Sequence, residues 1–73
     1  MFNELDVVKV LEDPPEHGIH AGQEGTIVHI HTIPRIAYEV EFADKEGEML
    51  AMIPLVESQL SIEWRMPPQR LAA

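Results

Sequence analysis

Histidine is the residue type in this chain most suited to chemistry, and there are four of them: His17, His20, His29 and His31. The last two are separated by one residue, so on a β-strand both imidazoles lie on the same face and could reach one metal ion. A zinc or nickel site needs three or four convergent ligands, and this pair supplies two. We therefore predict no metal or other cofactor, and favour surface histidines that pair with glutamates across a strand, as His29 would with Glu39.

The other reactive side chains give no catalytic pattern. A general acid and base need a water-poor cleft that separates their pKa values, whereas Glu39 and Glu41 are expected on an open sheet face. The glycine-containing segment 22–25 precedes an expected strand, so it does not form a phosphate loop at a helix N-terminus. The chain has no cysteine, and no serine has a base motif around it. We predict that the protein is not an enzyme.

Size and charge restrict the class of protein further. The 73 residues make one domain, and 13 acidic against 5 basic residues give a net charge of −8, which disfavours nucleic acids and anionic membranes as partners. The N-terminus lacks the basic residues of a signal peptide, and no apolar run approaches a membrane span, so we predict a cytoplasmic protein. All the acids lie in residues 1–63, whereas residues 64–73 hold only Arg65 and Arg70 as charged side chains. We expect a folded domain over 1–63 and a tail over 64–73.

Alternation of apolar and polar residues predicts five short strands. Two prolines end the first strand and begin a long loop, Gly47 suits a tight turn, and residues 56–59 suit one 3₁₀ turn. An oligonucleotide-binding barrel usually has a helix between its third and fourth strands, where this chain has only a turn. The pattern therefore predicts an all-β fold, a small five-stranded SH3-like barrel with a 3₁₀ turn before the last strand and an irregular C-terminal tail. The expected strands are Leu5–Leu11, Gly25–His31, Ala37–Phe42, Glu48–Ile53 and Leu60–Glu63.

Several motifs resemble a known family. They are Met1-Phe2-x-Glu-Leu-Asp-Val-Val, Glu12-Asp-x-Pro-x-x-Gly18 with Ala-Gly-x-x-Gly-Thr-Ile after it, Ala37-Tyr-Glu-Val-Glu-Phe, and Ser58-Gln-Leu. Together they are similar to the bacterial family catalogued as domain of unknown function 4926, over about residues 1–62. The resemblance implies an SH3-like fold in a small bacterial protein and carries no assigned activity.

The strand pairing that the alternation suggests sorts side chains into two faces. With a symmetric hairpin around Pro34, His29 lies opposite Glu39 and Ile27 opposite Glu41, while Phe42 faces Met49 across the next turn. The expected core is Val8, Val10, Val28, Ile30, Tyr38, Val40, Phe42, Met49, Ala51, Ile53 and Leu60. The expected outer face is Ile27, His29, His31, Glu39, Glu41, Leu50 and Met52.

An apolar stripe bordered by carboxylates indicates a contact surface. We expect a protein partner with a basic surface to bind at Ile27, Glu39, Glu41, Leu50 and Met52. The tail from Trp64 to Leu71 is an equal candidate to cover the stripe. It could fold back onto its own domain, or two copies could associate through the outer face and the tail. The function predicted is a non-enzymatic protein-binding module, such as an immunity or antitoxin protein or an accessory subunit. A ligand or metal site at the histidines is the alternative, and nucleic-acid binding is the least favoured.

Overall fold

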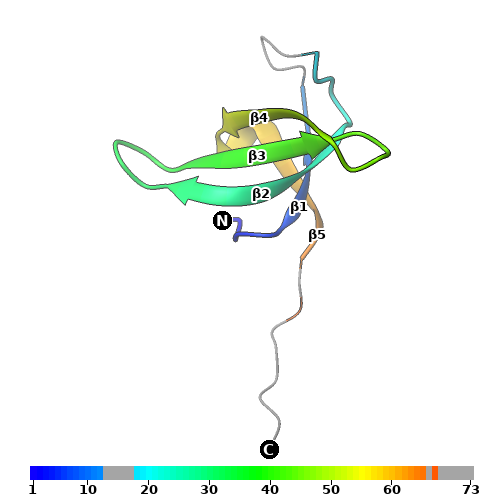
Figure 1. Cartoon of the computed structure of the whole chain (residues 1–73). Coiled ribbons are helices and arrows are strands. Elements are labelled where there is room, and N and C mark those ends of the chain that lie inside the picture. The colour runs from blue at the N-terminus through cyan, green and yellow to red at the C-terminus, as the bar shows by residue number, and fades with distance from the viewer. Residues whose placement is uncertain (13–17, 66, 68–73) are drawn as a thin grey trace, which may run out of the picture.

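A computed structural model describes residues 1–12, 18–65 and 67 as five strands and one 3₁₀ turn. The five strands form one antiparallel sheet in the order β4-β3-β2-β1-β5, which curves so that β1 and β5 cross behind the β2–β3–β4 layer (Figure 1). The predicted all-β class is confirmed, with five strands and a 3₁₀ turn before the last of them, whereas most of the expected C-terminal tail lies outside the described residues. The elements are β1 (Val7–Val10), β2 (Glu24–His31), β3 (Ala37–Ala43), β4 (Met49–Leu55), η1 (Glu57–Gln59) and β5 (Leu60–Trp64).

All five strands differ from their predicted bounds, and in β1 and β4 an end moves by two residues. β1 begins at Val7 because Leu5 has a positive φ of 72° and belongs to a turn, so the chain is not extended there. β4 continues through Pro54 to Leu55, beyond the predicted end at Ile53. A proline is tolerated in an edge strand because its missing N–H can face away from the ladder. Leu55 thereby becomes a strand residue with a buried side chain.

The turn between β3 and β4 forms as its residues predict. Gly47 has a φ of 83°, a value that residues with a Cβ rarely adopt. The Asp44 side chain accepts hydrogen bonds from the backbone N–H groups of Glu46 and Glu48, both at 2.9 Å. The Gly47 N–H donates to the Asp44 carbonyl at 3.0 Å and closes the turn.

A β-bulge divides the pairing between β2 and β3. His29 lies opposite Glu39, as predicted, but Ile27 lies opposite Val40 instead of Glu41. Val28 is the extra residue on β2, and the alternation of inward and outward side chains changes phase there. Ile27 is consequently fully buried, so its predicted outward position is wrong, and half-buried Val28 does not take the core place assigned to it.

The pairing between β3 and β4 is shifted by two residues from the predicted one. Tyr38, Val40 and Phe42 lie opposite Leu55, Ile53 and Ala51, respectively. A shift of two preserves the faces because side chains alternate with a period of two. A second irregularity follows Phe42 and sets Ala43 opposite Met49, which is exposed and not in the core as predicted.

The hydrophobic core lies between the inward faces of the curved sheet. Phe2, Ile30 and Ala51 pack against it while remaining partly accessible. Ile19 belongs to the core although it lies in the first loop, which the sequence pattern left without any inward residue. The buried members are Val8, Val10, Ile19, Ile27, Tyr38, Val40, Phe42, Ile53, Leu55 and Leu60.

Candidate protein-binding face

The outward side chains of β3 and β4 form the surface that we call the outer face: Glu39, Glu41, Leu50 and Met52. Register places Glu41 between Thr26 on β2 and Met52 on β4, so these three residues make one row across the sheet. The next row joins His29, Glu39 and Pro54. The outer face therefore combines apolar side chains from the edge strand with carboxylates from its neighbour.

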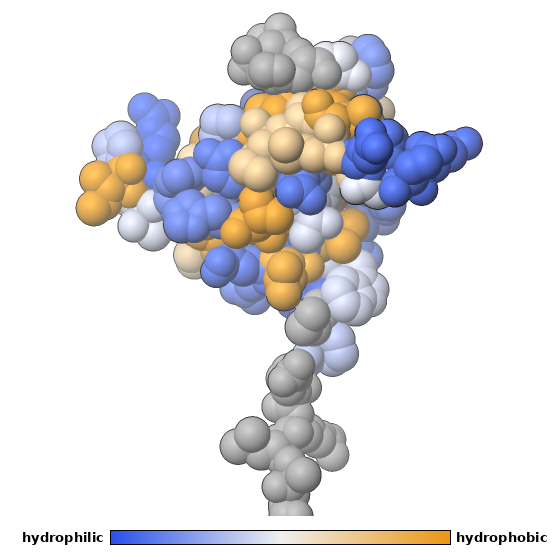
Figure 2. Space-filling view, viewed as in Figure 1, coloured by the Kyte–Doolittle hydropathy of each residue, from blue (hydrophilic) through white to orange (hydrophobic). Residues whose placement is uncertain are grey.

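The apolar part of the outer face is accessible in the described structure. Leu50 is 55% exposed and Met52 is 45% exposed, and Met49 beside them is also exposed. Leu50 is the unpaired residue of the second irregularity, between the pairs Ala43–Met49 and Phe42–Ala51. In Figure 2 apolar surface gathers over β4, next to the hydrophilic surface of the projecting β3–β4 turn. Such a contiguous apolar area beside charged groups is typical of protein contact sites.

The two carboxylates of the outer face have different surroundings. Glu39 accepts a hydrogen bond from His31, with Nε2 and Oε1 separated by 3.0 Å. Glu41 makes no side-chain hydrogen bond or ion pair within the described part of the chain, and it remains available to an external cation.

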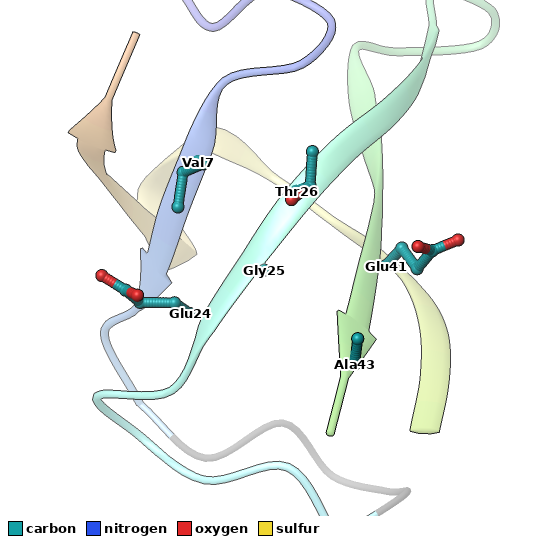
Figure 3. A pocket seen from close by; sticks show the side chains of 6 residues that line it. All are labelled: Val7, Glu24, Gly25, Thr26, Glu41 and Ala43. Carbon is teal, nitrogen blue, oxygen red and sulfur yellow. The ribbon is translucent and has the colours of Figure 1, made fainter. Parts of the chain in front are cut away.

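Beside Glu41 the surface has a shallow hollow of about 200 Å³. The small side chains of Thr26 and Ala43 line it together with Gly25, whose missing Cβ would point toward Val40 and Phe42 in the core. Figure 3 shows Glu24 and Glu41 pointing away from β2 on opposite sides of this hollow. The remaining lining residue is Val7, which pairs with Thr26 and so continues the row onto β1.

The histidines do not assemble a metal centre in residues 1–12, 18–65 and 67. The rings of His29 and His31 meet edge to face, with centroids 4.7 Å apart. The predicted partner of Glu39 was His29, which is its neighbour in the ladder, but His31 makes the hydrogen bond. His17 lies outside the described residues.

The beginning of the expected tail makes a contact that the sequence did not predict. Arg65 donates hydrogen bonds to both carboxylate oxygens of Asp6, and its Nη2 also donates to the Met1 carbonyl at 3.1 Å. Trp64 is the last residue of β5, pairs with Val7 and is exposed. The segment from Trp64 to Leu71, which was expected to cover the apolar stripe, lies mostly outside the described residues. Arg70 also lies outside them.

Asp6 is the one buried charged residue among those described, with 1% of its surface exposed. Burial opposes ionisation and raises its pKa. The Arg65 hydrogen bonds, the Asn3 N–H at 2.8 Å and the positive charges of Arg65 and the N-terminus outweigh that effect, so the pKa lies below its ordinary value. Asp6 and Arg65 are 59 positions apart, and neither has a motif that would signal the pairing.

A family model described as a domain of unknown function, DUF4926, matches residues 4–62. The chain belongs to the DUF4926 family. The match spans all five strands except the end of β5 and includes the whole outer face, so the candidate surface of this DUF4926 protein lies inside the family domain. Neither a curated protein nor a solved structure matches the chain significantly.

The helical structure described in the DUF4926 chain is the single turn η1. None of the helical structure in its described residues has the length and apolar character needed to cross a bilayer.

Proposed function

We propose that this protein is a non-enzymatic binding module that uses the outer face to hold a basic surface of another protein. The observation that carries the proposal is the position of exposed Leu50 and Met52 beside Glu41, a carboxylate without a partner in the described chain. Apolar residues at the centre of an interface exclude water, and charges at its rim select the partner.

The charge of the chain supports a basic protein as the partner. A net charge of −8 attracts cationic surfaces over several ångströms and speeds their encounter at low salt. The same charge opposes nucleic acids, whose binding depends on Lys and Arg contacts with phosphates. The basic surface could belong equally well to an enzyme that this protein inhibits or to a larger complex that it joins as a subunit.

The test is affinity capture with matched variants from cells that make the protein. Leu50→Lys places a cation in the apolar centre, whereas Leu11→Lys makes the same change at a leucine that is 54% exposed outside the outer face. We expect the wild type and Leu11→Lys to capture the same basic protein. Leu50→Lys should weaken that binding at least tenfold, about 1.4 kcal/mol.

Salt and charge reversal provide the second part of the test. Glu41→Lys should slow association, and added salt should weaken wild-type binding, because the rim acts through electrostatic attraction. Glu12→Lys, a reversal at an exposed residue outside the outer face, is the control. Equal capture by the Leu50→Lys and wild-type proteins would show that the binding surface lies elsewhere.

A further inference from the structure

The outer edge of β4 has backbone groups without partners in the described structure. β4 ends the sheet order and pairs only with β3, and no other backbone hydrogen bond reaches residues 49–55. Pro54 lies opposite Glu39 and has no N–H, so this pair is one of the non-hydrogen-bonded pairs that alternate along an antiparallel ladder. Two residues earlier, Met52 has the same orientation. Its N–H and C=O therefore point to the free edge.

The free edge lacks the charges that commonly protect such strands. Proteins usually block an exposed edge with lysines, prolines or bulges, and β4 has no charged residue from Met49 to Leu55. Its irregularity at Leu50 and its proline at position 54 limit the accessible segment to about Ala51–Ile53. That segment is short enough to resist uncontrolled aggregation and long enough to pair with one extended peptide.

Charge around the edge selects the occupant. Asp44, Glu46 and Glu48 precede β4, Glu57 follows it, and Glu41 lies on the adjacent strand, so acidic groups surround a charge-free edge. Lys45 is the one basic side chain in that set, and the N-terminal ammonium lies 3.5 Å from Glu57. A second copy would bring two such acidic borders together, whereas a segment with Lys or Arg residues would complement them.

We propose that an extended segment of the partner, rich in Lys or Arg, adds to the edge of β4 as a sixth strand. The inference rests on the function proposed above and names its mode of binding. The Met52 N–H and C=O bind the incoming backbone, which supplies affinity independent of side chains. Alternate side chains of the segment lie beside Leu50 and Met52, and its cations reach Glu41 and the acidic turn.

The experiment uses the full chain and three synthetic probes. The first is a capped hexapeptide of alternating lysine and valine. The second has the same sequence with an N-methyl group on every residue, which removes the N–H donors of both strand edges and blocks pairing while keeping charge and side chains. The third replaces each lysine by glutamate. Binding is followed by NMR shifts of β3 and β4 amides, and pairing is followed by hydrogen exchange of the Met52 amide.

We expect the lysine peptide to bind and to slow exchange of the Met52 amide at least tenfold. The N-methylated peptide should bind at least tenfold more weakly, and the glutamate peptide should not bind. Equal binding of the two lysine peptides would overturn strand addition while leaving a basic partner at the outer face intact. Absence of shifts with either lysine peptide would contradict both proposals. A Met52 amide already protected in a dimer of the free chain, measured by sedimentation, would show that a second copy occupies the edge.

Discussion

The Arg65 guanidinium holds the buried Asp6 carboxylate from the far end of the chain, with Nη2 2.9 Å from Oδ2. Asp6 in turn accepts the Asn3 N–H, and the same segment joins β2 through Leu5 N–H to the Ile27 carbonyl at 2.7 Å. The residue after β5 thus fixes the turn before β1. This contact links both ends of the described fold and makes its stability dependent on one ionised carboxylate.

Asp6→Asn should reveal that dependence as a function of pH. Because the folded pKa of Asp6 is lowered, its stabilisation is complete above the unfolded value of about 3.9 and is lost as pH falls through the folded value. At pH 7 the variant should lose about 1–3 kcal/mol of unfolding free energy. The difference in Tm from wild type should shrink below pH 4, as measured by circular dichroism. Glu12→Gln is the control, and a difference independent of pH would contradict the assignment.

Arg65→Ala should lower Tm at pH 7 because it leaves the buried Asp6 carboxylate without its charged donor. In the Asp6→Asn background the same substitution should cost much less, since the charge it serves is already absent. Arg35→Ala, at an exposed arginine between β2 and β3, should leave Tm unchanged. Additive effects of Asp6→Asn and Arg65→Ala would show that the contact does not form in solution.

Phe42→Ala should cost about 3–5 kcal/mol, because the ring is fully buried and its removal leaves a cavity. That loss is comparable to the total stability of a domain this small. Met49→Ala, at an exposed apolar residue of β4, should change stability by at most about 0.5 kcal/mol. Urea denaturation measures both changes, and a Phe42→Ala protein as stable as wild type would refute the core assignment.

Gly25→Ala should destabilise the protein by about 1–3 kcal/mol through overpacking. A Cβ at Gly25 would lie 2.5 Å from Cγ1 of Val40 and 2.9 Å from Cε1 of Phe42. Val40→Ala removes the nearest of these atoms, so the double variant should lose less stability than the sum of the two single losses. Strict additivity in urea denaturation would show that crowding at Val40 is not the cause.

The hydrogen bond between His31 and Glu39 should contribute at most about 1 kcal/mol, because both side chains are partly solvated. A double-mutant cycle of His31→Ala with Glu39→Gln should detect this coupling. The same cycle with His29→Ala should give a value near zero, although His29 is the ladder neighbour of Glu39. A larger coupling energy for His29 than for His31 would show that His29 is the residue that bonds to Glu39.

Local patterns were enough to predict the five strands and the turn at Gly47. Alternation is strict from Ala37 to Phe42, and each end of that strand has turn-forming residues, so its faces could be assigned without knowledge of the fold. Met49, beyond the irregularity at Leu50, is exposed although it was assigned to the core, whereas the outward direction of Met52 was predicted even though the pairing was displaced by two residues. Side-chain direction depends on parity, which such a displacement preserves.

The sequence by itself determined the elements, the acidic charge and the apolar stripe of β4, because these depend on neighbouring residues and on composition. Tertiary structure decided the remaining features. The bulge at Val28 turned Ile27 into the core, and the first loop brought Ile19 against it. Arg65 forms its hydrogen bonds with Asp6, a residue far from it in the sequence. Each of these depends on how distant segments pack together, and no local periodicity records that information.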